Sequence, residues 1–270
     1  MGRPNAGKSS LVNAILRDRR TIVSNVAGTT RDAIDIPYLH DGQPYVLIDT
    51  AGMRPRSRRD TSVEVFSAMR SEKAIRRADI CLLVIDIAAG ITQQDRRIAG
   101  IIAEEGKPCI IIVNKFDLFH PNASRKDRMA EVEEQVRREL FFINYAPFIA
   151  TSAKKAEGVE IIFKVITRIS QESHNMTTTG PLHHLIQLAQ QMNPPGAASG
   201  SARRLKIYYA TTAVDPKYNT IPVPRYVLFV NDKSLLTDSY SQYLRNKIRE
   251  AYPAPGIPVI FSARSRVRND

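Results

Sequence analysis

The 270-residue sequence contains only two cysteines, Cys81 and Cys109. Each lies within a run of apolar residues, so we interpret both as reduced thiols in the core of a protein from a reducing compartment. Two cysteines at this separation provide neither a disulfide framework nor the spacing of a metal site. The sequence therefore excludes a fold that depends on disulfides or on a cysteine-bound metal.

Long apolar stretches are also absent. No apolar run approaches the length that spans a membrane, and the first residues contain no apolar core of a signal peptide. Ala6 breaks the M-G-x-x-x-[ST] pattern of N-terminal myristoylation. We therefore expect a cytoplasmic protein without a membrane partner.

Acidic residues are few relative to basic ones. The chain has 39 Lys and Arg against 27 Asp and Glu, a net charge of +12. Residues 173–270 hold 12 of these basic residues and 5 of the acidic ones, so the C-terminal part is the more basic. This excess favours a polyanionic partner, although a solvated basic surface would give the same composition.

The length and the element pattern predict two domains. Residues 1–172 alternate apolar strand patterns with helix patterns, which favours an α/β fold with a doubly wound, mostly parallel sheet. Asp41-Gly42 between two strand patterns indicates a hairpin turn. The strands are expected at 32–39, 43–49, 78–86, 109–117 and 146–154, and the helices at 9–16, 61–77, 93–105, 126–140 and 157–169.

The pattern changes after residue 172. Residues 173–180 are polar and are expected to form a linker. Residues 181–270 then predict a small α+β domain in the order αββαβ. Its helices are expected at 181–192 and 237–251, and its strands at 203–211, 225–231 and 257–263.

The stretch GRPNAGKS (residues 2–9) matches the pattern G-x-x-x-x-G-K-[ST]. In such a loop the backbone N–H groups surround phosphates, the lysine pairs with the β and γ oxygens, and the serine hydroxyl binds Mg²⁺. The loop normally joins a buried strand to a helix. Here the helix SSLVNAIL follows at once, but no strand precedes the loop, so the motif alone could arise by chance.

Three further stretches favour a real nucleotide site. DTAG (49–52), NKFD (114–117) and TSAK (151–154) each end an apolar strand pattern. Ligands of an open α/β sheet bind at the carboxyl ends of its strands, so all four motifs are expected on one rim. Each motif alone has an ordinary explanation as a loop or a helix cap, but four in the right order favour the nucleotide site.

Asp117 predicts which base is bound. A carboxylate at this position can accept hydrogen bonds from N1–H and the 2-amino group of guanine, whereas adenine offers neither donor. A buried carboxylate left unpaired would reject the wrong base by roughly 10⁴-fold. The sequence therefore predicts a guanine-nucleotide site.

Several longer stretches carry a family resemblance: GRPNAGKSSLVN (2–13), AGTTRD (27–32), DTAGMR (49–54) and IDIAAGITQQDRRIA (85–99). They resemble the Era-like group of GTPases, and within it most closely the Der (EngA) family. The C-terminal part is similar to the KH-like domain of that family through PRYVLFVND (224–232), SYSQYLRNKIRE (239–250) and GIPVIF (256–261). Proteins of that family carry two tandem GTPase domains before the KH-like domain. The resemblance covers nearly the whole chain and implies that it corresponds to the second GTPase domain and the KH-like domain.

The resemblance implies roles for single residues. Lys8, Thr30 and Gly52 would act in catalysis on the β/γ-phosphates. Ser9, Thr30 and Asp49 would hold Mg²⁺. The residues expected to bind GTP or GDP are Gly2, Asn5, Ala6, Gly7, Lys8, Ser9, Ser10, Asn114, Lys115, Asp117, Ser152, Ala153 and Lys154.

Two residues bear on how fast GTP would be hydrolysed. Asn5 matches an asparagine that binds K⁺ in several related GTPases, where the ion would do the electrostatic work of an arginine finger. An amide that only stabilises the loop is an equal alternative. Met53 occupies the position of the water-orienting glutamine in Ras-like enzymes. Since an apolar side chain cannot orient water, we expect slow intrinsic hydrolysis, assisted by K⁺ or by a ribosomal partner.

The C-terminal domain lacks the G-x-x-G loop with which KH domains grip RNA. Its glycines are Gly180, Gly196, Gly200 and Gly256, and no two are three residues apart. Charge would remain as the means of binding RNA phosphates. The candidates are Arg203, Arg204, Lys206, Arg245, Lys247, Arg249, Arg264, Arg266 and Arg268, together with Arg54, Arg56, Arg58 and Arg59 of the first domain. Base stacking by Tyr208, Tyr209, Tyr240 and Tyr243 is disfavoured relative to a packing role.

The resulting prediction is a monomeric GTPase that acts as a conformational switch in assembly of the large (50S) ribosomal subunit, with precursor particles or rRNA as partner. An RNA-binding module with a vestigial pocket, or an Era-type or tRNA-modification GTPase, stays open as an alternative. We also expect about five apolar residues to precede the loop in a longer protein, as a central strand between 43–49 and 78–86. Met1 would then mark a fragment or a misassigned start, a GTPase domain could lie upstream, and this chain would bind GTP more weakly than a longer one.

Overall fold

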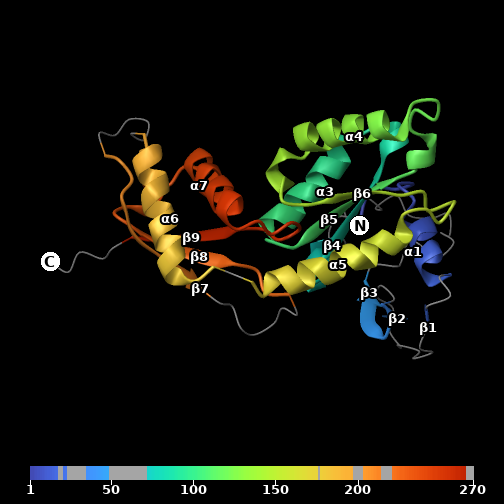
Figure 1. Cartoon of the computed structure of the whole chain (residues 1–270), viewed down its shortest axis with the longest axis horizontal. Coiled ribbons are helices and arrows are strands. Elements are labelled where there is room, and N and C mark those ends of the chain that lie inside the picture. Colours follow the sequence, from blue (N-terminus) through green and yellow to red (C-terminus); the bar gives the residue numbers. More distant parts are fainter. Residues whose placement is uncertain are drawn as a thin grey trace, which may run out of the picture. The chain divides into compact units, whose positions relative to one another are not determined.

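The computed structural model describes residues 1–17, 21–22, 35–48, 72–175, 177–196, 203–213 and 221–265. The chain divides into two compact units, residues 1–168 and 169–270. The division falls within helix α5 (Val159–Ser173), whose course is shown in Figure 1. No helix in these described ranges is both long enough and apolar enough to cross a membrane.

Unit 1 is built on the predicted parallel sheet. Strands β4 (Cys81–Asp86), β5 (Cys109–Asn114) and β6 (Phe148–Ala150) pair in the order β4-β5-β6. The register aligns Cys81 with Cys109 and Asp86 with Asn114. Every residue of β5 is buried, as expected for a strand covered on both faces. The α/β class with a parallel sheet is confirmed.

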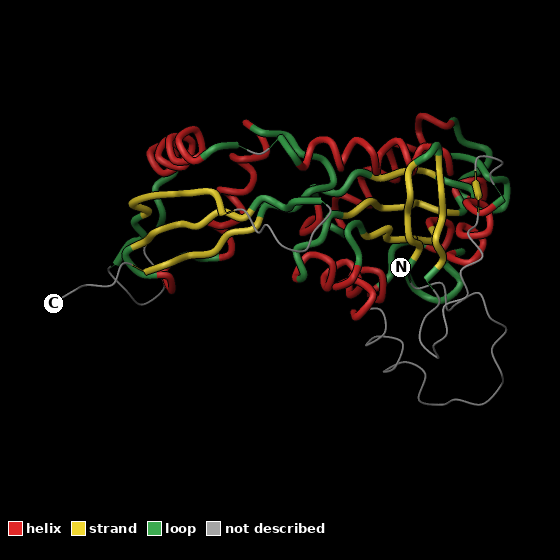
Figure 2. The backbone as a smooth tube through the Cα atoms, turned by 90° about the horizontal axis from the view of Figure 1, so that it is seen from below, coloured by secondary structure: helices red, strands yellow, loops and turns green. Residues whose placement is uncertain are grey.

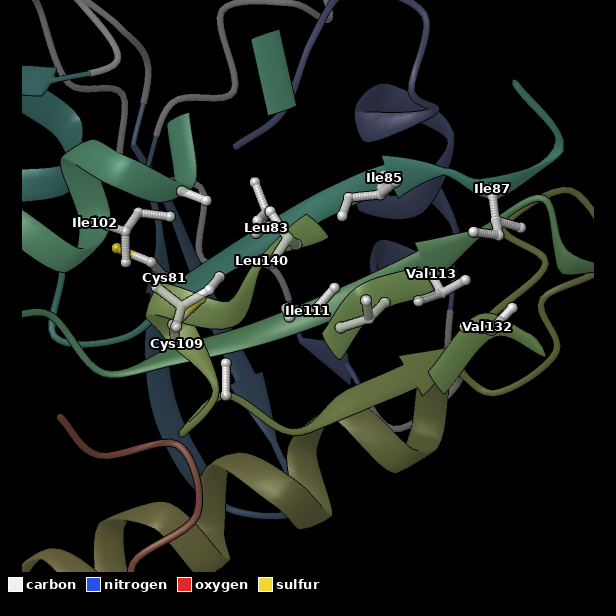
Figure 3. Packing of buried hydrophobic residues seen from close by; sticks show 14 of the residues in the cluster. Cys81, Leu83, Ile85, Ile87, Ile102, Cys109, Ile111, Val113, Val132 and Leu140 are labelled. Carbon is white, nitrogen blue, oxygen red and sulfur yellow. The ribbon is translucent and has the colours of Figure 1, made fainter. Parts of the chain in front are cut away.

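Alternate residues of β4 and β5 face opposite layers. Leu83, Ile85, Ile111 and Val113 pack into one cluster with helices α3 (Gln93–Glu104) and α4 (Arg125–Glu139), and Figure 3 shows their side chains on the same side of the sheet. The opposite face is covered by α1 (Lys8–Leu16) and α5 (Figure 1). Figure 2 shows the same backbone from below. Period-two alternation within continuous apolar strands therefore builds both faces of the core.

The two cysteines are core residues, as predicted from the sequence. Both are free and buried. Burial raises the pKa of the Cys81 thiol to about 11 and raises the pKa of the Cys109 thiol well above its ordinary value. Loss of solvation penalises the thiolate in both cases, so the two thiols stay protonated and unreactive at neutral pH.

A hairpin packs beside this sheet. Strands β2 (Ile36–His40) and β3 (Gln43–Leu47) are antiparallel, with β1 (Thr21–Ile22) at the edge of β2. Asp41 and Gly42 both have positive φ angles, 47° and 78°, as the predicted two-residue turn requires. The ring of His40 stacks on Phe163 of α5 at 4.1 Å between centroids, which joins the hairpin to the helix layer.

The two sheets of unit 1 are separate, since β3 belongs to one and β4 to the other. Along the outer edge of β4, the amino group of Met1 donates to the carbonyl of Leu82 at 2.8 Å. The N–H of Val84 donates in turn to the carbonyl of Met1 at 2.7 Å. These bonds continue the parallel ladder for one residue. The strand expected between β3 and β4 stays a prediction.

Several element boundaries differ from the predicted ones for local reasons. Strand β5 ends at Asn114 rather than at 117, because Lys115 has a left-handed backbone with φ 60°. Residues 72–77 are helical, while the remainder of the helix predicted at 61–77 lies outside the described residues. Short 3₁₀ turns occupy Ile87–Ala89, Phe116–Leu118, Phe141–Ile143 and Lys233–Leu235.

Unit 2 has the predicted αββαβ order. After α6 (Thr179–Met192), β7 (Ile207–Ala213) pairs antiparallel with β8 (Arg225–Val230). Helix α7 (Asp238–Ala251) then leads to β9 (Ile260–Ser265), which is parallel to β8. Leu182, Ile186, Leu228, Leu244 and Ile248 meet in a core separate from that of unit 1.

The predicted linker is too long at its C-terminal end. Thr179 and Gly180, the last two residues of the predicted linker, form the start of α6 with Thr178 as the N-cap. Pro181 is compatible with this start because the first N–H groups of a helix have no partner within the helix. The polar residues 178–180 therefore form the N-cap and first residues of α6 rather than a linker.

Helix α6 covers the outer edge of β7 with its side chains. Gln190 accepts from the N–H of Ile207 at 3.1 Å and donates to its carbonyl at 3.3 Å. His183 Nδ1 accepts from the N–H of Ala210 at 3.3 Å. Further along, the hydroxyl of Thr179 accepts from the N–H of Thr212 at 3.4 Å. These bonds satisfy backbone groups that an edge strand would otherwise leave without a partner.

Candidate functional site

Residues 2–7 form a tight turn that enters helix α1. Asn5 and Gly7 have left-handed φ angles of 62° and 90°, and turns of this kind direct backbone N–H groups toward a common point where an anion can bind. A Cβ at Gly7 would lie 2.1 Å from the amide nitrogen of Asn114, and one at Gly2 would lie 2.3 Å from the carbonyl of Val84. Only glycine fits at these two positions. Gly7 is also the N-cap of α1, whose partial positive charge adds to the anion site.

Lys8 folds its side chain back across this turn. Its Nζ donates to the carbonyl of Gly2 at 2.6 Å and to that of Arg3 at 2.7 Å. These two bonds hold the ammonium charge at the loop. Ser9 and Ser10 follow in the first turn of α1, at the positions expected for the Mg²⁺ ligand and its neighbour.

Asn114 joins three loops on this rim. Its Nδ2 donates to the carbonyl of Ala6 at 2.9 Å, and its Oδ1 accepts from the N–H of Ala153 at 3.0 Å and from the hydroxyl of Thr151 at 3.3 Å. The residue is 1% exposed. The side chain that was expected to contact the base is thus used inside the protein, where it holds the phosphate loop against the segments after β5 and β6.

Lys115 and Asp117 lie at the same rim. The left-handed backbone of Lys115 turns the chain out of β5 into the 3₁₀ turn that contains Asp117. Both residues are partly exposed, so a ligand can reach them. Lys115 Nζ lies 2.5 Å from the Asp86 Oδ2 atom at the end of β4. The structure therefore brings the predicted base-reading residues beside the phosphate loop.

The segment after β6 forms a closed loop. Ser152 is buried, and its N–H and carbonyl pair with the carbonyl and N–H of Glu157 at 3.0 and 3.1 Å. Ala153 is buried while Lys154 is exposed. Of these three predicted contacts, Ala153 is the one fixed directly to the base-reading segment, through Asn114.

Three predicted site residues, Thr30, Asp49 and Gly52, lie outside the described residues, as do Met53 and the arginines at 54, 56, 58 and 59. Of the proposed Mg²⁺ ligands only Ser9 is described. Within the described ranges no group of three or more His, Cys, Asp or Glu residues could hold a metal ion by itself. A Mg²⁺ ion at Ser9 would thus depend on the phosphates and on residues of the other segments.

Arg3 has a structural role that the sequence motif did not reveal. Its Nη2 donates to the carbonyls of Asp86 at 3.1 Å and Gly90 at 3.2 Å, and its Nε lies 3.5 Å from Oδ2 of the fully buried Asp95. Asp95 also accepts from Thr92 in the capping box of α3. The loop pattern allows any residue at Arg3, so the pattern does not indicate these contacts. Among the residues that make them, only Asp86 had a recognisable sequence signal, because it is an acid at the end of an apolar strand.

The candidate RNA contacts of unit 2 fall into two groups. Arg245 and Arg249 donate to the carbonyls of Val259 and Ile257 at 3.2 and 3.3 Å, and burial lowers the pKa of Arg245, so these two hold α7 in place. Arg203, Arg204, Lys206 and Arg264 are exposed. Lys247 pairs with Glu250 at 2.7 Å. Arg266 and Arg268 lie outside the described residues.

The four tyrosines divide in a similar way. Tyr240 and Tyr243 donate their hydroxyl protons to the carbonyls of Asn193 and Ala189 at 3.1 and 2.9 Å, so their packing role is confirmed. Tyr208 and Tyr209 are 48% and 44% exposed. These two are the aromatic side chains of β7 that solvent reaches.

Comparison with known proteins agrees with this site. A family model described as 50S ribosome-binding GTPase matches residues 1–115, and one described as the C-terminal KH-domain-like part of EngA bacterial GTPase enzymes matches residues 177–264. GTPase Der of Akkermansia muciniphila is 96% identical over all 270 residues. The chain belongs to the Der (EngA) family of GTPases.

More distant Der proteins match over the same extent. GTPase Der of Caldanaerobacter subterraneus subsp. tengcongensis is 44% identical over 266 residues, and that of Bacillus cytotoxicus is 45% identical over 270, each covering 98% of this chain. The chain spans 58% of the length of each of these three relatives. The two matched family models together cover the phosphate loop, the rim of β4 and β5 and most of unit 2.

Proposed function

We propose that this Der-family chain binds GTP and GDP on the rim formed by residues 2–9 and 114–117, and that it hydrolyses GTP. The observation that carries the proposal is the buried amide of Asn114, which bonds to Ala6 of the phosphate loop and to Ala153 of the segment after β6. Loops from three parts of the chain are thereby bonded to one side chain. Such preorganisation favours tight binding.

The described residues supply binding and electrostatic stabilisation. The turn at 2–7 and the N-terminus of α1 present N–H groups to phosphate oxygens, and Lys8 adds a positive charge held at the loop by two carbonyls. Charge that develops on the phosphates during transfer would be stabilised by these fixed groups. Mg²⁺, when bound at Ser9 with Thr30 and Asp49, would neutralise charge between the β- and γ-phosphates.

The base-reading role is tested by Asp117→Asn. The amide offers a donor to the 2-oxo group of xanthine, so preference should shift from GTP toward XTP. Fluorescence titration with both nucleotides measures the shift. Unchanged nucleotide preference would contradict the role of Asp117, and failure of the unaltered chain to bind GDP would instead favour an RNA-binding module with a vestigial pocket.

We further propose that Asn5 binds K⁺ beside the phosphates. Its left-handed backbone, with φ 62°, places it at the bend of the loop. Single-turnover hydrolysis should then be slower in Na⁺ than in K⁺ at equal ionic strength, and Asn5→Ala should abolish the difference. Equal rates in both salts would contradict the K⁺ site.

The proposed biological role is assembly of the large ribosomal subunit in the cytoplasm, through contacts of the exposed basic residues of unit 2 with rRNA. The net charge of +12 and the 50S ribosome-binding description of the family model for residues 1–115 support it. Sedimentation with purified particles tests it. The chain should bind large-subunit precursors with strong salt dependence, whereas binding only to small-subunit particles would favour an Era-type function.

A further inference from the structure

Asp86 contacts both halves of the candidate site. It ends β4 next to Asn114, which ends β5. Its carboxylate oxygen Oδ2 lies 2.5 Å from Lys115 Nζ of the base-reading segment. Its main-chain carbonyl accepts from Arg3 Nη2 of the phosphate loop at 3.1 Å. One residue at a strand end is therefore bonded to the two segments that would hold the opposite ends of a nucleotide.

Because Asp86 is largely buried, its charge depends on the pairing with Lys115. The Asp86 side chain is only 12% exposed and that of Lys115 is 32% exposed. The second carboxylate oxygen, Oδ1, is buried and has no hydrogen-bond partner within the described residues. Within that part of the structure the negative charge of Asp86 is balanced by Lys115. A carboxylate removed from water in this way holds its one cationic partner firmly.

The contact with Asp86 orients the side chain of Lys115. A lysine side chain is a flexible four-carbon stem with a compact charge at its end. Here the stem leaves a backbone that is itself fixed in the left-handed region, with φ 60°, and the ammonium group is held at Asp86. The stem is therefore held by contacts within the protein, and a ligand that packs against it would not have to order it on binding.

On the phosphate side, Arg3 is held at several points. Besides its bond to Asp86 it donates to the carbonyl of Gly90 at 3.2 Å, and its Nε lies 3.5 Å from Asp95 Oδ2. The Arg3 side chain is 15% exposed and that of Asp95 is fully buried. The start of the phosphate loop is thereby tied to the end of β4 and to the first turn of α3.

We propose that Asp86 is a positioning residue for nucleotide binding, which orients Lys115 through its carboxylate and the start of the phosphate loop through its carbonyl. The inference rests on the proposed function and names a residue that the loop and base motifs do not contain. The carboxylate of Asp86 acts through Lys115, so the effect of removing its charge should not depend on which polar groups the base carries.

The test is Asp86→Asn, with affinities for GDP and IDP measured by calorimetry on the whole 270-residue chain. The amide keeps the shape of the side chain and its carbonyl, but it removes the charge that holds Lys115. We expect GDP and IDP to lose affinity by the same factor, about tenfold or about 1.4 kcal/mol. IDP lacks the 2-amino group read by Asp117, so an equal loss separates positioning of Lys115 from damage to base recognition.

A double-mutant cycle adds a readout that general destabilisation would not reproduce. Lys115→Met should weaken both nucleotides, and the variant with both changes should bind about as well as Lys115→Met alone, because Asp86 acts through that lysine. Glu139→Gln is the matched control. It changes an acid paired with Arg96 and Arg138 on the surface and should leave both affinities unchanged.

The outcomes distinguish the two proposals. If the unaltered chain binds no GDP, both the proposed function and this inference fail. If it binds GDP and Asp86→Asn binds equally well, or if the losses of the single variants add in the double variant, only the inference fails. Circular dichroism monitors folding, and should Asp86→Asn not fold, an unchanged GDP affinity of Lys115→Met would still overturn the inference.

Discussion

Replacement of Asn114 by alanine tests the arrangement of the site most directly. The change removes three hydrogen bonds, from Asn114 to Ala6 and from Ala153 and Thr151 to Asn114. Thr151 can rotate its hydroxyl, but the carbonyl of Ala6 and the N–H of Ala153 cannot move without moving the backbone. A buried polar group left without a partner costs about 1–3 kcal/mol. Two such groups give an expected loss of roughly 2–6 kcal/mol.

This loss can appear in two places. If the loops stay in position, the free energy of unfolding of unit 1 falls by roughly this amount. If they separate so that water reaches the two groups, unfolding changes less and the affinity for GDP falls instead, by about tenfold for each 1.4 kcal/mol. We therefore predict the sum of the two losses, in the free energy of unfolding and in the free energy of GDP binding.

Urea unfolding followed by circular dichroism, together with calorimetric titration of GDP, measures both parts. Because the chain has two units, the unfolding curve is fitted with two transitions. Asn144→Ala is the control, since Asn144 is exposed in the same unit. An Asn114→Ala chain that unfolds and binds GDP like the unaltered chain would refute the role of this residue.

Two further predictions follow from single positions. Gly7→Ala should weaken GDP binding more than tenfold, because φ is 90° there and the new Cβ would lie 2.1 Å from a side-chain nitrogen. Gly100→Ala lies inside α3 with open space around it, so it should instead stabilise the chain by roughly 0.5–1 kcal/mol. Titration with GDP measures the first effect and melting curves measure the second. Burial raises the pKa of the Cys81 thiol from 9.0 to about 11. The buried thiol therefore contributes its full stabilisation below pH 9. This contribution is lost between pH 9 and 11, because the unfolded chain releases the proton first. Unfolding free energies of Cys81→Ser should therefore fall less steeply over this range than those of the unaltered chain, and parallel curves would contradict the assignment.

The order of elements could be predicted from sequence because continuous apolar strands alternate with helical patterns. The placement of NKFD and TSAK on one rim followed from the rule that ligands bind at the carboxyl ends of parallel strands. Two kinds of feature could not be predicted. The first is the early end of β5, which depends on Lys115 adopting a left-handed backbone, as non-glycine residues rarely do. The second is the set of contacts between residues far apart in the sequence.

The inward direction of the Asn114 side chain, and the contacts of Arg3 and Asp86, depend on residues more than eighty positions apart. No local pattern encodes such pairs. The same limit applies in unit 2. Charge alone placed Arg245 and Arg249 among the RNA candidates, whereas their carbonyl partners arise from the packing of α7 against the segment at 257–259.

The side chains of α6 along β7 also restrict how unit 2 can be recognised. Extended peptides bind many proteins by adding a strand to an open sheet edge, and exposed edges of the same kind promote aggregation. Gln190, His183 and Thr179 occupy the backbone groups that such a strand would need. A partner that approaches β7 must therefore use side chains such as Tyr208 and Tyr209 rather than main-chain pairing. Specificity at this edge is then set by the chemistry of those side chains.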